Sequence, residues 1–347
     1  MTYAAMALSI NVLKKQFIAI AHDDAPNVSV YPWNDSTGYG TKVADPATAP
    51  TGNGTGVGFS PSGNAICVNH QISPFLSAYP WSSSGFGSKY ANPGTLPFGF
   101  GRTVNWSNSG ADIAACSDAS LFVVAYPWTT SGFGSKYANP ATAVVNEGRG
   151  ISFKPSDDAI AVAHSTSPFI SLYAWTSGTG WGSRYSNPAT LPSDNGFSIY
   201  WNPTGTDVGV ANSGAFPITV YPWSSGFGTK YANPAAGFGL TGQGFKFTAK
   251  GTDVGICTFG TPNLNYYPFT SGTGLGSRYS NPASLPGSSC VSMNFSVTDL
   301  ATAVVNGTSP RVHAYPWTSG TGFGTKYANP ATTPGTSGRG VAFISTN

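Results

Sequence analysis

The sequence predicts an all-β ring built from seven copies of one unit, and three observations predict it. A Tyr-Pro-Trp motif, once with Ala for Pro and once with Phe for Trp, recurs at intervals of 46 to 48 residues. A Gly-x-Gly-(Ser/Thr)-(Lys/Arg) motif follows every copy, and an Asn-Pro or Asp-Pro ends it. One period sustained through a whole chain is the signature of a repeat architecture. The seven copies begin at Tyr31, Tyr79, Tyr126, Tyr173, Tyr221, Tyr267 and Tyr315.

Each repeat contains four short strands. In the clearest copy, the alternation of Ile151 with Phe153 and of Ile160 with Val162 predicts two half-buried strands joined by a turn at 155–158. A third strand at 169–173 runs into the Tyr-Pro-Trp position, and the Gly-x-Gly turn leads into a fourth, outermost strand. No segment of ten or more residues has a 3.6-residue period, so we expect almost no helix. Four antiparallel strands per repeat form one blade, and the fold is therefore predicted to be a seven-bladed β-propeller.

The two ends of the chain predict how the ring closes. Residues 17–22 match 159–164, so the chain enters the repeat at its second strand, whereas 338–343 form a first strand with nothing after it. One blade would then take its first strand from the C-terminus and its other three from the N-terminus, which leaves no free sheet edge. Residues 1–10 fit no repeat and are expected to be an arm that contacts a partner, with 11–347 as a single propeller.

Composition excludes several classes of protein. Charged residues make up 8% of the chain, against roughly 25% in a typical soluble domain. The 14% of aromatic residues argues against disorder. A net charge of +3 without a concentrated basic face argues against nucleic-acid binding. The first ten residues lack the features of a secretory signal, and no apolar run approaches the ~20 residues of a membrane helix. We therefore expect no signal peptide and no membrane insertion.

Histidines and arginines recur at two fixed places of the repeat. Three histidines end second strands, and three arginines begin first strands; these are His22, His70, His164, Arg102, Arg149 and Arg339. If the hairpin is symmetric about its turn, Arg149 faces His164, and ring closure places Arg339 beside His22. Together they would form a ligand or docking face near the central channel. The alternative is that a polar residue ends the strand and hydrogen-bonds the following turn.

The tryptophans of the repeated motif also allow two interpretations. They could be platforms on which sugar rings stack, or wedges packed between neighbouring blades, and packing is favoured. Exposure decides between the two, because only exposed rings can bind sugars. The residues are Trp33, Trp81, Trp128, Trp175, Trp223 and Trp317.

Enzyme chemistry is not expected from the sequence. The 13 acidic residues are scattered, mostly in turns, and no blade carries an outlying catalytic cluster. The histidines come from separate blades and lack the carboxylates that usually orient metal ligands, so no metal and no cofactor are expected.

The strand pattern Gly-x-Gly-x-x-Phe-x-Pro-Ser-x-x-Ala-(Ile/Val)-Ala resembles the blades of WD-repeat-type β-propellers, although their Gly-His and Trp-Asp dipeptides are missing. The dense Tyr-Pro-Trp repeats are similar to repeat proteins of tailed bacteriophages, which are commonly virion components. This resemblance implies a non-enzymatic structural or interaction protein of a virion, such as a capsid decoration or a tail appendage, assembled in the host cytoplasm. Its partners would be other virion or scaffold proteins, or a host-surface glycan. The alternative is a multivalent, lectin-like glycan-binding propeller.

Overall fold

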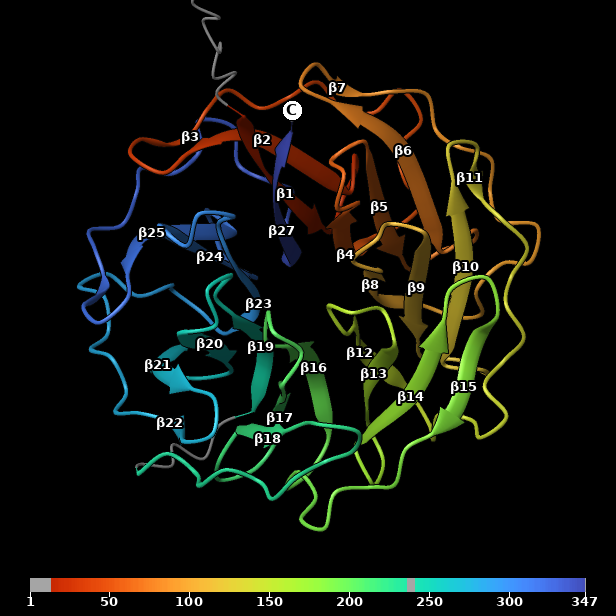
Figure 1. Ribbon diagram of the computed structural model, residues 1–347. Helices are drawn as coiled ribbons and strands as arrows, with labels where there is room; N and C mark the ends of the chain where they lie inside the picture. Colours follow the sequence, from red (N-terminus) through yellow and green to blue (C-terminus); the bar gives the residue numbers. More distant parts are fainter. Residues whose placement is uncertain (1–13, 236–240, 347) are drawn as a thin grey trace, which may run out of the picture.

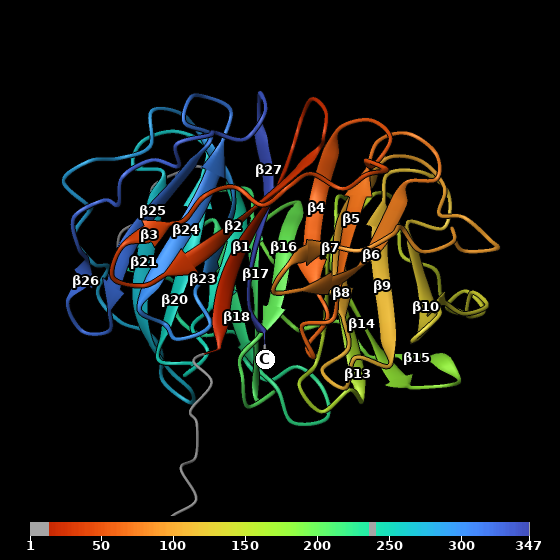
Figure 2. The ribbon, with the colours of Figure 1, turned by 90° about the horizontal axis from the view of Figure 1, so that it is seen from above.

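Seven antiparallel sheets stand around a central axis, and the computed structural model describes residues 14–235 and 241–346 (Figure 1). Seen from the side, the sheets form a thick disc (Figure 2). No helix occurs among these residues, so none that could cross a membrane does either. The all-β, seven-bladed prediction is confirmed. The proposed arm at 1–10 lies outside the described residues.

The strands of each blade run from the channel outward. The innermost strands are β4 (Gly54–Phe59), β8 (Gly101–Trp106), β12 (Gly148–Phe153), β16 (Gly196–Trp201), β19 (Gly242–Phe247), β23 (Cys290–Phe295) and β27 (Gly338–Thr346). The second strands are β1 (Lys15–His22), β5 (Ala65–His70), β9 (Asp112–Ser117), β13 (Ala159–His164), β17 (Asp207–Asn212), β20 (Asp253–Thr258) and β24 (Ala301–Asn306). The third strands are β2 (Val28–Asn34), β6 (Leu76–Ser82), β10 (Val123–Thr129), β14 (Ile170–Thr176), β18 (Ile218–Pro222), β21 (Leu264–Thr270) and β25 (Val312–Thr318).

The outermost strands are β3 (Gly38–Tyr39), β7 (Gly85–Phe86), β11 (Gly132–Phe133), β15 (Gly180–Arg184), β22 (Gly274–Leu275) and β26 (Gly322–Phe323). In the remaining blade a single bridge between Trp223 and Phe227 takes the place of this strand. Glycine is needed at the turn into these strands because its φ is positive, for example 102° at Gly132.

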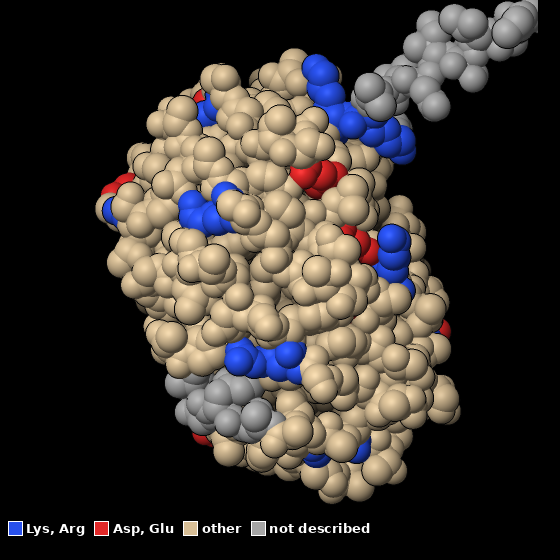
Figure 3. All heavy atoms as spheres, turned by 90° about the vertical axis from the view of Figure 1, so that its left-hand side faces the viewer, with Lys and Arg blue, Asp and Glu red and all other residues tan. Residues whose placement is uncertain are grey.

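Second strands are buried on both faces, which explains why they are rich in Ala, Val and Ile. All six residues of β13 are buried, because the sheets of the two neighbouring blades cover its two sides. The surface, in contrast, carries few charges, which are scattered over the face in Figure 3. The four cysteines are buried free thiols, three on second strands and Cys290 on the innermost strand β23. Apolar burial between sheets is therefore the main stabilising term of the ring.

The ring closes as the ends of the sequence predict. β27, from the C-terminus, pairs antiparallel with β1, from the N-terminus, with Phe343 opposite Ile18 and Ala342 opposite Ala19. The resulting sheet has the order β27-β1-β2-β3, so two ends of the chain share one blade.

Aromatic wedges hold neighbouring blades together. The indole of Trp175 meets Phe153 of its own blade, Trp181 of the outermost strand and Tyr137 of the preceding repeat, all edge to face at 5.1–5.3 Å. The Tyr-Pro-Trp tyrosine adds a tie to the preceding repeat, since the hydroxyl of Tyr173 donates to the carbonyl oxygen of Thr142 at 2.9 Å.

Burial settles how the six motif tryptophans are used. Five of them are 1–6% exposed and Trp128 is half-buried, so packing is the correct interpretation and the sugar-platform alternative is wrong. The physical reason is that each ring fills the space between two diverging sheets. Those buried are Trp33, Trp81, Trp175, Trp223 and Trp317.

Closure of the ring makes a testable contribution to stability. Replacing the fully buried Ile18 of β1 by Ala should lower the free energy of unfolding by about 2–5 kcal/mol, because it leaves a cavity between the closing sheet β27-β1-β2-β3 and the sheet of β24 and β25. Urea unfolding measures this loss. The matched control is Ile72→Ala, since Ile72 is 57% exposed and its truncation should change little. If the two variants lost the same free energy of unfolding, Ile18 would not be buried in the sheet that β27 completes, and the closure of the ring would be contradicted.

Candidate functional site in the central channel

A bulge near the start of each innermost strand turns one side chain out of the ladder. In β12, Gly148 faces His164 and Gly150 faces Ala163, so Arg149 between them has no partner on β13. The same irregularity occurs in β27, where Arg339 is skipped between Gly338 and Gly340. Bulges re-aim side chains in this way. The expected pairing of Arg149 with His164, and of Arg339 with His22, is therefore wrong.

The skipped residues form a ring at one end of the channel. Three of the seven are arginines, and the ring consists of Thr55, Arg102, Arg149, Phe197, Gln243, Val291 and Arg339. Neighbouring innermost strands approach closely here, since a Cβ at Gly150 would lie 2.7 Å from the carbonyl oxygen of Phe197. Glycine at this position is thus what lets the strands converge.

Glu147 joins two of these arginines. One carboxylate oxygen, Oε1, contacts Nη2 of Arg102, while Oε2 accepts from Nε and Nη2 of Arg149 at 3.0 and 2.8 Å. The guanidinium of Arg149 also lies 4.4 Å from the centroid of the Phe197 ring, a cation–π contact. The hydroxyl of Thr103 donates to the carbonyl oxygen of Arg149 at 2.6 Å, which fixes the bulge from the neighbouring blade.

Arg339 is anchored separately. Its Nε and Nη2 donate to the two carboxylate oxygens of Asp23 at 3.2 and 2.7 Å. Since a guanidinium has five N–H groups, each of the three arginines keeps donors that these carboxylates do not use. The acids orient the guanidinium groups without saturating them.

The arginines and Glu147 line a cavity of about 420 Å³, within the roughly 300–1,000 Å³ usual for ligand sites. Glu147 is the only acidic residue among its lining residues. Apolar contacts come from Phe197, Phe259 and Met293. Asp118 also lies near Arg102, with Oδ2 3.7 Å from Nη2, so three carboxylates accompany the three arginines. A small organic molecule therefore fits this end of the channel in size, and the unused guanidinium N–H groups are suited to an anionic group on it.

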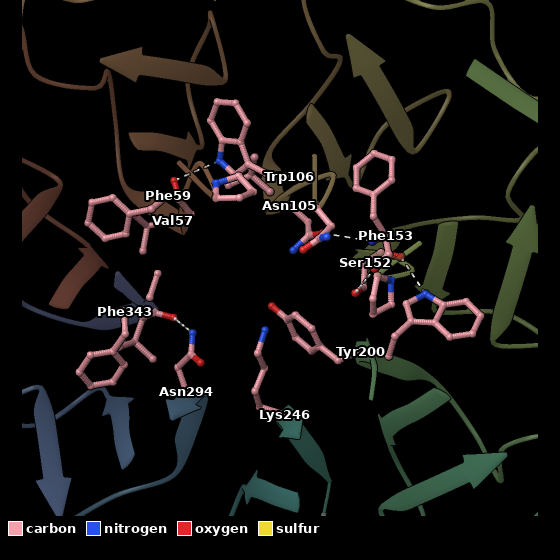
Figure 4. A pocket seen from close by; sticks show the side chains of 18 residues that line it. Val57, Phe59, Asn105, Trp106, Ser152, Phe153, Tyr200, Lys246, Asn294 and Phe343 are labelled. Carbon is pink, nitrogen blue, oxygen red and sulfur yellow. Dashed lines mark hydrogen bonds between the residues drawn. The ribbon is translucent and has the colours of Figure 1, made fainter. Parts of the chain in front are cut away.

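A second cavity of about 270 Å³ occupies the other end of the channel, where Lys246, Tyr200, Asn105 and Asn294 point toward a common centre (Figure 4). Val57, Val104, Tyr200 and Val341 line both cavities, so the two meet at that level. Among the described residues, no group of three or more His, Cys, Asp or Glu could hold a metal ion.

The three predicted histidines do not line either cavity. Each is fully buried and its Nε2 lies 2.9–3.0 Å from the hydroxyl of a serine seven residues later, on the third strand. In His70, Nδ1 donates to the carbonyl oxygen of Ile72 at 2.8 Å, so Nε2 accepts from Ser77. Another blade uses Asn212 and Thr219 for the same pairing. These contacts fit the alternative in which a polar residue ends the strand.

Sequence reasoning found the arginines but missed Glu147 and Lys246. Both could have been found by aligning the repeats with one another. The residue just before the innermost strand is acidic only at Glu147, and the residue before the last aromatic of that strand is charged only at Lys246.

No family model matches this sequence, and no curated protein matches it. Solved structures match in fold along the whole chain. A proposed 6-phosphogluconolactonase from Bacteroides fragilis has a TM-score of 0.75 at 9% identity, covering 96% of this chain and 99% of its own. The periplasmic gluconolactonase of Pseudomonas aeruginosa gives 0.73 at 13% identity, covering 96% and 100%. A protein from Lactobacillus plantarum gives 0.70 at 12% identity, covering 95% and 99%.

Identities this low show the fold alone, yet these structures correct two expectations. Three of the structures that match over nearly the whole chain are propellers named as lactonases. The expected phage virion component, with its lectin alternative, and the expected absence of enzyme activity are both contradicted. Closed edges, dense β structure and even repeats follow from the propeller architecture itself and do not indicate a function.

Burial of the histidines predicts how stability depends on pH. Desolvation lowers the pKa of His70 and of His164 to about 4, below the value near 6.5 of an unfolded chain. A group whose folded pKa is lowered binds more protons when unfolded. Stability is therefore complete above pH 6.5 and falls as pH decreases toward 4, by up to about 3 kcal/mol for each histidine.

The double variant His70→Asn and His164→Asn, which copies the pairing of Asn212 with Thr219, should lose less stability than wild type between pH 7 and pH 4.5. Urea unfolding at several pH values measures the slope. The reverse change, Asn212→His, should make the slope steeper. An unchanged slope in the double variant would show that other groups control the acid sensitivity.

Proposed function

We propose that this propeller is a hydrolase that opens the lactone ring of an anionic sugar acid, with its site at the arginine end of the channel. The observation that supports this best is the single carboxylate of Glu147 held between Arg102 and Arg149 inside a cavity of about 420 Å³. The names of the structurally similar propellers suggest the reaction class.

The arginines supply binding and charge stabilisation. Arg102 and Arg339, whose side chains are 41% and 43% exposed, present guanidinium donors to the negative group of the substrate. Arg149 is less exposed, at 21%, and is fixed by Glu147 and the Phe197 ring. A donor held in a fixed position beside the reacting carbonyl stabilises the oxyanion that forms there.

Glu147 supplies the base. A carboxylate has about four lone-pair positions, and two N–H groups of Arg149 donate to Oε2. Oε1 forms an ion pair with Nη2 of Arg102 and keeps a lone-pair position that can hold a water. The water loses a proton to Glu147 as its oxygen bonds to the lactone carbonyl carbon. The ring C–O bond then breaks, and Glu147 returns the proton to the ring oxygen, which gives the open hydroxy acid.

Glu147→Gln should lower kcat for lactone hydrolysis by about 100-fold or more and leave KM little changed, because it removes the base while keeping the shape. Arg102→Met should mainly raise KM. Hydrolysis of 6-phosphogluconolactone and of gluconolactone, with the spontaneous rate subtracted, is the assay. Because gluconolactone is neutral, comparing the two lactones measures what the negatively charged phosphate contributes.

Matched controls come from residues that line neither cavity. Asp158 lies in an exposed turn and Arg184 on the outermost strand, where it donates to Asn187 at 2.8 Å. Asp158→Asn and Arg184→Met should retain wild-type activity. Failure of the wild-type protein to accelerate hydrolysis of either lactone, or full activity of Glu147→Gln, would rule out this function.

A further inference from the structure

The second cavity contains a ring of residues in which one blade differs from all the others. Seven innermost strands each contribute the residue just before their final aromatic, and these are Gly58, Asn105, Ser152, Tyr200, Lys246, Asn294 and Ala342. All of them line the cavity of about 270 Å³. Six are uncharged and the seventh is a lysine, so the repeat does not account for the lysine.

Lys246 has no counter-ion. Its Nζ lies within 4 Å of no carboxylate in 14–235 or 241–346, and no residue that lines the cavity is acidic. Its one charge-stabilising contact there is the face of Tyr200, whose ring centroid is 3.6 Å from Nζ. Protein atoms surround the side chain, but part of its surface remains open to the cavity. An enclosed charge without a partner costs stability, which suggests a role other than folding.

Hydrogen-bond donors surround this ammonium group. The amide oxygen of Asn105 accepts from the backbone N–H of Phe153 at 3.1 Å, which orients its NH₂ group away from that strand. In the part of the chain that the structure describes, neither this NH₂ group nor the hydroxyl of Tyr200 donates to another residue, and both point toward the same centre as Lys246 (Figure 4). One cation and two unused donors, with no carboxylate, match the needs of an oxyanion.

We propose that Lys246, Tyr200 and Asn105 form a binding site for a small oxyanion group, such as sulfate, phosphate or the phosphate of an organic molecule. The site is separate from the arginine ring. The two rings lie three residues apart along each strand, roughly 10 Å at about 3.3 Å per residue. The proposal does not depend on the lactonase function, because it uses none of the residues assigned to that reaction.

Binding at this site depends on pH in a defined direction. Burial lowers the pKa of Lys246 to about 7, and Tyr200, the only other titratable residue lining the cavity, stays neutral because burial raises its pKa to about 12. Lys246 is charged below pH 7 and loses its charge as pH rises through 7. Affinity for an anion should therefore be highest below pH 7 and fall about tenfold per pH unit above it.

Sulfate is the suitable probe, because its own charge is constant between pH 5 and pH 9. Calorimetric titration of the full chain should show binding that weakens above pH 7. Lys246→Met should reduce the affinity at pH 6 at least tenfold. Lys246→Arg, which keeps a positive charge that does not titrate in this range, should bind sulfate with an affinity that is constant from pH 6 to pH 9.

Two further variants separate this site from other cations. Lys250→Met alters an exposed lysine in the turn that follows β19, and it should leave the affinity for sulfate unchanged. Arg149→Met tests the arginine ring. The proposal is overturned if Lys246→Met binds sulfate like wild type, or if Arg149→Met alone removes the binding and its pH dependence.

If Lys246→Met does not fold, the outcome with Lys246→Arg decides, since sulfate binding that still weakens above pH 7 in that variant also overturns the proposal. Parallel titrations with inorganic phosphate and glucose 6-phosphate at pH 6 distinguish a free oxyanion from one carried by an organic molecule. A stronger response to glucose 6-phosphate identifies the carried group as the preferred ligand.

Discussion

Edge-to-face packing of aromatic rings between diverging sheets is the interaction on which the ring depends. Sheets that radiate from one axis separate as they run outward, and a gap of that shape has to be filled by large, rigid side chains. Trp175 fills it with three ring contacts, of which the contact with Tyr137 links its blade to the preceding repeat. The thickness of these aromatic layers also sets the distance between neighbouring innermost strands. That distance determines the width of the channel that the strands enclose.

The repeat and its closure could be predicted because they are periodic. The Tyr-Pro-Trp spacing fixes the number of blades, and the match of 17–22 with 159–164 fixes where the chain enters the first blade. Packing of the tryptophans and the strand-ending role of His70 were alternatives that the sequence allowed and burial decided. Periodic features follow from local sequence patterns, which can be recognised in the sequence without a structure.

The chemistry of the channel could not be predicted in the same way, for two reasons. The bulge at Arg149 shifts the register by one residue, so a hairpin drawn with ideal pairing turns this side chain toward His164 instead of toward the channel. Glu147 and Lys246 are single departures from the repeat, and attention to what the repeats share overlooks them. Similarity between blades indicates structure here, whereas the two proposed sites rest on differences between blades.

The bulged ring also bears on how such a protein can change over time. A residue at that position takes part in no ladder pairing with the second strand, and its side chain lies in the channel instead of between sheets. Substitutions there alter what the channel presents while leaving the inter-blade packing intact. Seven blades thus offer seven nearly independent positions around one small volume, and a duplicated unit with a new side chain at that position can acquire a new ligand without rebuilding the scaffold.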